Sequence, residues 1–332
     1  GTINNGAISL TSCMTKKTTG ELRAKDIIIV KLTPSGVCEW IHQISSNCNN
    51  DYCSGTDSND YLNDLKTDSS GNIYLVGKIR GQFNDHQSFG NYDGFIIKLN
   101  SQGDIVFSKV LGGNAYDTVN QLHLDNQQNL YLFGTTEGDT FSDNLHGGYN
   151  LFWMKLNKNY ELIWTNQIGI PLLDEINAVI PVDISNFVIV AKYFNLNNLK
   201  NNIWLLKIDA DGEKIWSNEE GQQHDLDVND MLPDNSGNLY LTGSVKKQTE
   251  LNRDFYFAKY DSNGALVWDK NFGSDANDEM TAIDFDGISS FYLTGFTEGN
   301  YKDFINRGKK DFVYMKYTED GTEESNYQFG TE

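Results

Sequence analysis

Five aspartates stand at the start of similar short runs along the chain, and three of them are followed by an asparagine three residues later. The aspartates are Asp60, Asp117, Asp174, Asp225 and Asp278, and the asparagines are Asn63, Asn120 and Asn177. Ca²⁺ prefers carboxylate and amide oxygens, so a ring of these side chains would suit a calcium site. Alternatively, each carboxylate accepts hydrogen bonds from backbone N–H groups of its own loop. The recurrence in every unit favours the second interpretation, because functional sites seldom repeat five times.

A second set of residues combines an aromatic ring with a nearby carboxylate in three long polar segments, two of which also carry a histidine. The set is Phe83, Asp85, His86, Phe141, Asp143, His146, Tyr301 and Asp303. A ring can cover the apolar face of a sugar while a carboxylate binds its hydroxyl groups, so the set predicts a ligand-binding face. Packing within the loops is the alternative. His224, in another link, is interpreted as a surface histidine.

All four cysteines lie in the first sixth of the chain: Cys13, Cys38, Cys48 and Cys53. Cys48 and Cys53 bracket a polar loop in which a small disulfide would close, and we predict that pair and an oxidising location. Free thiols are the alternative. A zinc site is disfavoured because no CxxC spacing exists.

The residues above must be positioned by a repeat of about 52–67 residues. Its clearest part, "DNSGNLYLTG" at Asp234, returns as "DSSGNIYLVG" at Asp68 and "DNQQNLYLFG" at Asp125. Each repeat reads as four short runs of alternating polarity, separated by Gly, Asn and Asp turns. Four-stranded units of this length are typical of a β-propeller. We therefore predict an all-β fold, a single six-bladed β-propeller.

The units "GNIYLVG…DGFIIKLNSQGDIVFSKVLGG" resemble the bacterial β-propeller repeats labelled SBBP. The resemblance covers nearly the whole chain. It implies a propeller, nominally of seven blades, and a secreted or surface location, whereas counting gives about six units here.

We predict one domain over 1–332, with complete blades at 60–116, 117–173, 174–225, 226–277 and 278–332. The piece 1–59 aligns with the end of a repeat, so this closure blade lacks its innermost strand. Three explanations remain open: a longer polypeptide supplies the strand, the blade closes without it, or a neighbouring molecule donates it by β-augmentation.

A run-four aromatic also recurs, as Trp40, Phe107, Trp164, Trp216 and Trp268. It could stack on sugars, but packing between neighbouring blades is the favoured interpretation. The turn after the first run and the turn after the third lie on one face of a blade, and the longer links lie on the other. Because binding usually resides in variable loops on a rigid scaffold, we expect the long-link face to bind.

The net charge of −20 argues against nucleic acid and anionic membrane as partners. No apolar run approaches a membrane span, and the first residues do not resemble a signal peptide, which a mature or trimmed form would also lack. No GxSxG, HExxH or phosphate-loop motif is present. We therefore predict a non-catalytic binding or assembly module, extracellular or at the cell surface, with a protein or glycan partner. The alternatives are a lectin, a filament subunit completed by a donated strand, and a metal-dependent hydrolase.

Overall fold

The computed structural model describes residues 26–46, 59–83, 86, 89–138, 148–169, 172–183, 186–221, 224–247 and 251–331. Within these ranges the chain forms strands and turns and no helix. No described helix is therefore long and apolar enough to cross a membrane. The all-β prediction is confirmed.

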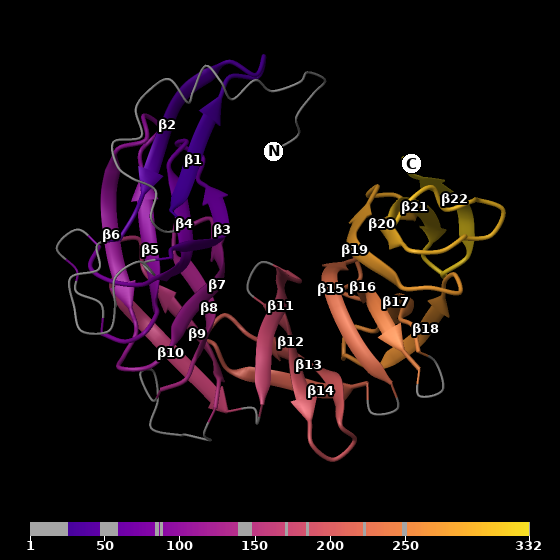
Figure 1. Cartoon of the computed structure of the whole chain (residues 1–332). Coiled ribbons are helices and arrows are strands. Elements are labelled where there is room, and N and C mark those ends of the chain that lie inside the picture. The colour runs from indigo at the N-terminus through magenta and orange to yellow at the C-terminus, as the bar shows by residue number, and fades with distance from the viewer. Residues whose placement is uncertain are drawn as a thin grey trace. The chain divides into compact units, whose positions relative to one another are not determined.

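The described strands form one two-stranded sheet and five four-stranded sheets, each antiparallel and in chain order (Figure 1). The two-stranded sheet comprises β1 (Ile27–Leu32) and β2 (Cys38–Ile44). The next two comprise β3 (Tyr61–Thr67), β4 (Ile73–Ile79), β5 (Asp93–Leu99) and β6 (Ile105–Leu111), then β7 (Asp117–Leu124), β8 (Leu130–Thr136), β9 (Asn150–Leu156) and β10 (Leu162–Gly169). The last three comprise β11 (Leu173–Pro181), β12 (Phe187–Asn195), β13 (Lys200–Ile208) and β14 (Lys214–Glu220), then β15 (Asp225–Pro233), β16 (Leu239–Lys246), β17 (Asp254–Tyr260) and β18 (Leu266–Phe272), then β19 (Asp278–Phe285), β20 (Ser290–Thr297), β21 (Asp311–Thr318) and β22 (Glu323–Phe329).

The five complete sheets fall in the five predicted complete blades, to within one residue at their starts. Each has the up-and-down order of a propeller blade, so the fold is propeller-like and built from repeats. In the first repeat, the predicted strand at 2–12 lies outside the described residues.

The recurring "D-x-x-G-N" turn has a local physical cause. Asp234 accepts hydrogen bonds from the backbone N–H groups of Ser236 and Asn238 at 2.8 and 3.0 Å. Gly237 takes a φ of 78°, which a side chain would disfavour. Asp68 and Asp125 bind their own turns in the same way. The motif is therefore a self-capped hairpin turn.

The first strand of every complete sheet carries a β-bulge at the same place. The extra residue follows the one paired with a glycine or alanine of the second strand, as Leu62 pairs with Gly77. A bulge leaves one residue outside the ladder and redirects its side chain. The extra residues are Asn63, Asn120, Asn177, Asn229 and Thr281.

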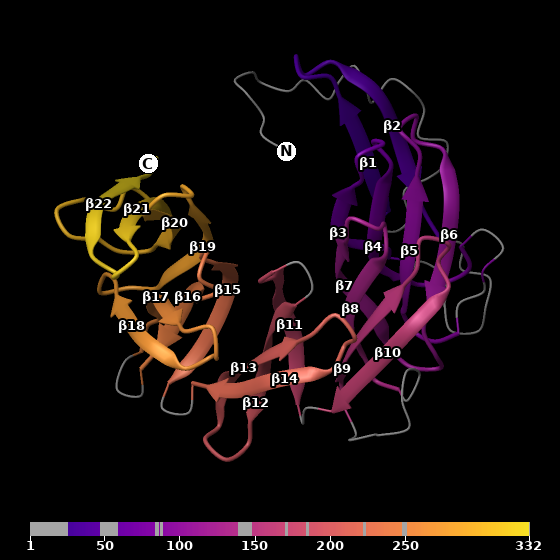
Figure 2. The same ribbon diagram turned by 180° about the vertical axis from the view of Figure 1, so that it is seen from behind.

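The chain divides into two compact units, Gly1–Gly169 and Ile170–Glu332. The single domain stays a prediction. In each unit, consecutive sheets bury apolar side chains between them. In the second unit, for example, Ile203 of β13 and Tyr256 of β17 belong to one buried apolar cluster. The sheets β15–β18 and β19–β22 lie side by side in both views (Figure 1 and Figure 2). We call each such contact between consecutive sheets a seam.

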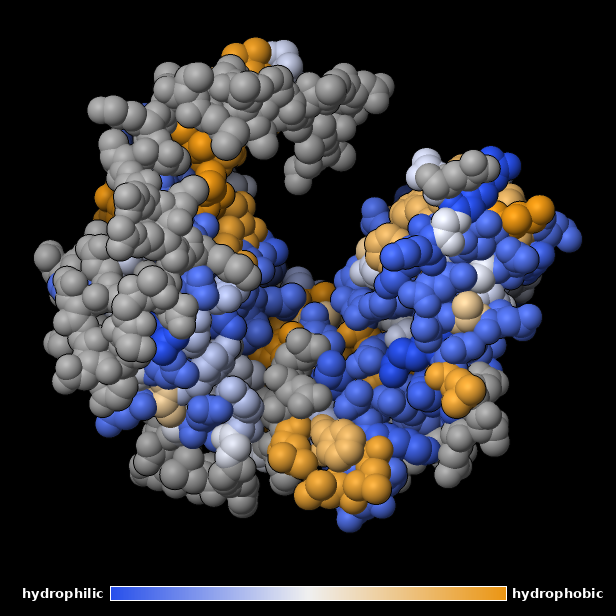
Figure 3. Space-filling view, in the orientation of Figure 1, coloured by the Kyte–Doolittle hydropathy of each residue, from blue (hydrophilic) through white to orange (hydrophobic). Residues whose placement is uncertain are grey.

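In the first four complete sheets the central strands are buried on both faces, as in β4 and β5, whereas the fourth strands are largely exposed at their starts. This pattern explains the near-continuous apolar second and third runs in the sequence. In the last sheet the central strand β21 alternates between buried and exposed residues. Most coloured atoms of the second unit in Figure 3 are hydrophilic, in keeping with the acidic composition.

Candidate functional site

The blade-head aspartates bind their own incoming loops. Asp60 accepts hydrogen bonds from the backbone N–H and the hydroxyl of Ser46, both at 2.7 Å. Asp117 accepts from the N–H of Gly113 at 2.7 Å, and Asp278 likewise binds Ser274. All three carboxyls are buried. Burial raises the pKa of Asp60 to about 6, and it also raises the pKa of Asp117 and of Asp278. These contacts support the loop-ordering interpretation.

Asp225 does not occupy the equivalent position, contrary to our alignment. Val228 pairs with Gly243 as Val119 pairs with Gly134, so the residue matching Asp117 is Leu226. Leu226 is buried in the apolar core, while Asp225 instead pairs with Arg253 at 3.4 Å. A uniform ring of five carboxylates is therefore not formed.

The side chain of Asp174 lies outside the described residues, as do Asp85, Phe141, Asp143, His146, Cys48 and Cys53. Among the described residues, no three His, Cys, Asp or Glu side chains come together to hold a metal ion. Cys38 is disulfide-bonded. The predicted Cys48–Cys53 pair stays a prediction.

The asparagines at the bulges join neighbouring sheets. The Nδ2 of Asn63 donates to the carbonyl oxygen of Val119 at 2.9 Å, and Asp64 accepts from the N–H of Leu122 at 3.1 Å. We call this pair of contacts the seam clamp. It recurs in the second unit, where the Nδ2 of Asn229 donates to the carbonyl oxygen of Met280 at 2.7 Å and Asp230 accepts from the N–H of Ile283 at 3.0 Å.

Two aromatic residues of the predicted ligand face are not at the surface. Phe83 and Tyr301 are buried, at 4% and 3% exposure, and each lies in an apolar cluster between sheets. His86 forms an isolated bridge with Phe83, and Asp303 is exposed. The rings of Phe83 and Tyr301 therefore cannot cover a sugar in this structure, and they pack as the alternative interpretation proposed.

The run-four aromatics pack against the following sheet, as favoured. The indole N–H of Trp40 donates to the carbonyl oxygen of Ser101, and that of Trp216 donates to Ser262, both at 3.3 Å. Phe107 stacks on Tyr160 with ring centroids 3.7 Å apart. The interpretation of these aromatics as seam packing is confirmed for these three.

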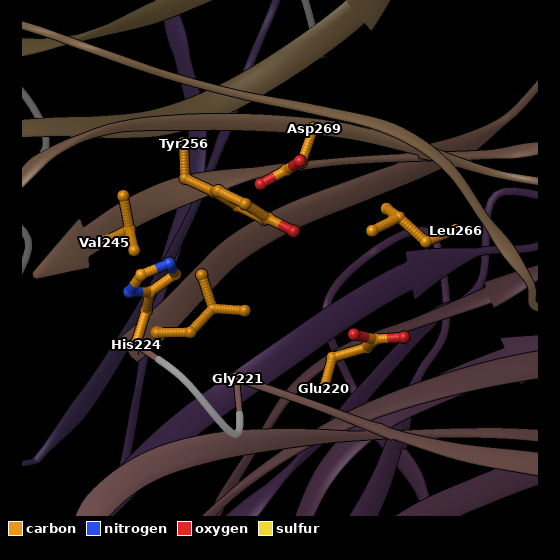
Figure 4. A pocket seen from close by; sticks show the side chains of 8 residues that line it. Glu220, Gly221, His224, Val245, Tyr256, Leu266 and Asp269 are labelled. Atoms are coloured by element: carbon orange, nitrogen blue, oxygen red, sulfur yellow. The ribbon is translucent and has the colours of Figure 1, made fainter. Parts of the chain in front are cut away.

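The strongest candidate site is a cavity of about 400 Å³ at the seam between β11–β14 and β15–β18, here called the seam pocket (Figure 4). It is lined by Glu220, Gly221, His224, Leu226, Val245, Tyr256, Leu266 and Asp269. The first five belong to the end of the sheets from which the links after the second and fourth strands emerge. This is the predicted binding face, although the pocket uses none of the eight predicted ligand residues.

Glu220 breaks the repeat pattern. It follows Trp216 by four residues and pairs with Ile203 of β13. At the equivalent position in the other repeats the chain always carries an apolar residue. These residues are Ile44, Leu111, Ile168, Phe272 and Phe329. A carboxylate where the repeat calls for an apolar side chain costs solvation energy, so its presence indicates a function beyond packing.

The electrostatics of the seam pocket are uncompensated. Burial raises the pKa of Glu220, and the nearby charge of Asp269 raises it further. Neither carboxylate has a cationic partner among the described residues. Figure 4 shows both carboxylates directed into the space that His224 and Tyr256 also face.

The pocket also holds unused hydrogen-bonding capacity. The hydroxyls of Tyr256 and Tyr260 lie 3.2 Å apart and share one hydrogen bond. Two hydroxyls carry two protons, so one buried O–H remains without an acceptor among the described residues. The Nδ1 of His224 is buried and likewise has no hydrogen-bond partner within the described part of the chain. Burial raises the pKa of both tyrosines, which therefore stay neutral.

Sequence reasoning missed Glu220, yet a signal was present. Aligned fourth runs end in an apolar residue and glycine, as in "KVLGG", "NQIG" and "KNFG", whereas this one ends "NEEG". His224 was noted, but only as a surface residue.

No protein-family model matches the chain, and no curated protein matches it in sequence. Among solved structures, it is similar to a puromycin hydrolase mutant complexed with PGG, at 10% identity and a TM-score of 0.50. That match covers 87% of this chain but only 40% of the other. A member of the DUF4221 family from Bacteroides vulgatus matches at 11% identity and a TM-score of 0.36, over 92% of this chain and 87% of that one.

The β-propeller domain of the Trilobed protease from Pyrococcus furiosus matches at 12% identity and a TM-score of 0.34, over 82% of this chain and 94% of that domain. At these identities a likeness concerns the fold alone. The repeated four-stranded sheets define the class, an all-β protein of the propeller type.

Proposed function

We propose that this chain is a non-catalytic binding module that holds a small ligand, or a side chain of a partner, in the seam pocket. The single observation that carries the proposal is Glu220, an uncompensated carboxylate at a position that every other repeat fills with an apolar residue. Recognition without chemistry fits the site, because in the described part of the chain no hydrogen bond joins Glu220, Asp269 or the His224 imidazole to a nucleophilic hydroxyl.

A matched pair of variants tests this proposal. Glu220→Leu installs the residue that another repeat carries as Leu111, and Glu213→Gln neutralises an exposed turn acid outside the pocket. A fragment library screened by ligand-observed NMR should yield ligands that Glu220→Leu loses and Glu213→Gln retains. If the screen finds no ligand whose binding depends on Glu220, the proposal is contradicted.

The setting of the module is also proposed. The six repeats form one six-bladed propeller of the SBBP type, located outside the cell or at its surface, where the partner is a protein or glycan. The repeat count, the recurrent seam clamp and the acidic composition support this proposal. This proposal assigns no role to calcium. Fractionation of the producing cells tests the location, and a cytoplasmic protein would contradict it.

Assembly into a filament or complex is the second candidate, favoured by an exposed aromatic face on β19–β22. Phe312 and Phe329 are 42% and 56% exposed, whereas Phe255, the equivalent of Phe312 in β17, is fully buried by the following sheet. Orange atoms lie among blue ones on this sheet in Figure 3.

In the assembly candidate, a sheet of a second copy covers this face. The single-propeller proposal needs no second copy. Native mass spectrometry separates the two, because oligomers of the 37.5 kDa chain that Phe312→Glu dissociates would favour assembly. A monomer at all concentrations would exclude it.

A further inference from the structure

We infer that the seam pocket binds an organic primary ammonium that carries a hydrogen-bond acceptor, such as a hydroxyl or carbonyl oxygen, close to its nitrogen. This inference rests on the proposed function and names its ligand class. It combines the charge of the pocket, its unused hydrogen-bonding atoms and the nature of its walls.

The charges of the lining residues indicate that the ligand is a cation. Glu220 and Asp269 face one cavity without a cation among the described residues, and Glu220 has no described hydrogen-bond donor. The two carboxylates repel each other. An anionic ligand would add to this repulsion, and a neutral ligand would leave it unchanged. A cation placed between the two carboxylates removes it.

The lining decides between a metal and an organic cation. Ca²⁺ needs six to eight oxygen ligands, whereas the pocket offers two carboxylates beside an imidazole and apolar walls. The walls formed by Leu226, Val245 and Leu266 suit a ligand with a carbon skeleton. A cavity of about 400 Å³ has room for one.

The count of donors and acceptors points to a primary ammonium. Such a group has three N–H donors. In the part of the chain that the structure describes, three acceptors of the pocket have no protein donor: the half-buried Glu220, the exposed Asp269 and the buried Nδ1 of His224. Nδ1 accepts when the imidazole is neutral with its proton on Nε2. A tertiary or quaternary amine could serve at most one of these acceptors.

The tyrosine pair points to the second group of the ligand. Tyr256 is 4% exposed and lines the pocket, and its pair with Tyr260 holds one O–H that has no acceptor within the described ranges. An oxygen near the ammonium would accept that proton. At the equivalent positions the five other repeats carry Ile28, Phe95, Phe152, Trp204 and Val313, so Tyr256 is a second departure from the pattern.

Amino alcohols, amino sugars and the amino terminus of a peptide all carry this chemistry, and they can be told apart by choice of probe. Ethanolamine, glucosamine and glycinamide represent the three sources. N-acetylethanolamine and N-acetylglucosamine are neutral controls of nearly the same shape, and propylamine is an ammonium without the oxygen.

Calorimetric titration of the full chain at pH 7 tests the inference. At least one of the three ammonium probes should bind at least tenfold more tightly than its neutral control. The control is the N-acetyl compound for ethanolamine and glucosamine, and acetamide for glycinamide. Glu220→Gln should weaken that probe at least tenfold, and Glu213→Gln should not. Tyr256→Phe should weaken it at least threefold and leave propylamine unchanged.

Thermal unfolding of each variant verifies that it is folded before it is titrated. Equal binding of a probe and its acetylated control, or binding unaffected by Glu220→Gln, would overturn the inference. A fragment that depends on Glu220 but is neutral or anionic would refute the ammonium class and leave the proposed function standing. Absence of any ligand dependent on Glu220 would refute both.

Discussion

The phenolic oxygens of Tyr256 and Tyr260 lie 3.2 Å apart in the interior of the seam between β11–β14 and β15–β18. Both rings are almost fully buried, so their hydroxyls depend on each other for hydrogen bonding. Both tyrosines belong to the buried apolar cluster of this seam, and Tyr256 also lines the seam pocket. The hydrogen bond between them can be tested by mutation.

Tyr260→Phe should destabilise the fold by about 1–2 kcal/mol, because it leaves the Tyr256 hydroxyl buried without a partner. The double variant Tyr256→Phe/Tyr260→Phe should be close to wild type, since both polar groups are then gone. Urea unfolding of the four proteins in a double-mutant cycle measures the coupling. Additive losses would show that the hydroxyls do not interact.

The seam clamp makes a second prediction. Asn63→Ala and Asn229→Ala should each cost about 1–2 kcal/mol, because each removes a hydrogen bond to the backbone of the next sheet. Asn159→Ala, in the exposed turn between β9 and β10, is the matched control and should change stability by less than about 0.5 kcal/mol. The free energy of unfolding of the three variants is measured with a chemical denaturant. Equal losses in all three would show that the seam clamp does not stabilise the fold.

Asp60 predicts how stability depends on pH. Its folded pKa of about 6 lies above the ordinary value of 3.8, so the folded state holds the proton more tightly than the unfolded chain. This contribution is fully present below pH 3.8 and is lost as the pH rises through 6, by up to about 3 kcal/mol. Unfolding free energies measured between pH 4 and 7 should therefore fall less steeply in Asp60→Asn. An unchanged slope in that variant would contradict the assignment.

Glu220→Leu should stabilise the unliganded protein at pH 7 by about 1–2 kcal/mol, since it replaces a desolvated carboxylate by an apolar side chain in an apolar seam. The raised pKa of Glu220 means that its penalty grows as the pH rises above the ordinary range of glutamate. The gain from Glu220→Leu should therefore be larger at pH 7 than at pH 4, as thermal unfolding at the two values would show. A destabilised variant would indicate that Glu220 serves the fold.

The repeat pattern predicted the sheets and their order because turns and alternating runs are local features. Hairpin turns are capped by their own aspartates, so each "D-x-x-G-N" segment determines its structure without distant contacts. The packing of run-four aromatics was also predictable, since equivalent aromatic residues in stacked repeats meet equivalent neighbours.

Other features depend on tertiary context. Asp225 is misplaced by one residue when the repeats are aligned on their aspartates, because the bulge residue Asn229, which matches Asn63, puts Leu226 at the place of Asp60. The burial of Phe83 and Tyr301 follows from links folding back on their sheets, which polar loop sequences conceal. Glu220 and Asp269 lie 49 positions apart in sequence and meet only at a seam between sheets, so no local pattern joins them.

Titration of the wild-type chain and of Glu220→Leu with ethanolamine, glucosamine and glycinamide tests the central claim most directly. At least one of these ammonium compounds should bind the wild type saturably and should not bind Glu220→Leu. The Glu220→Leu variant should also unfold at a higher temperature than the wild type. Identical binding isotherms for the two proteins would contradict the central claim.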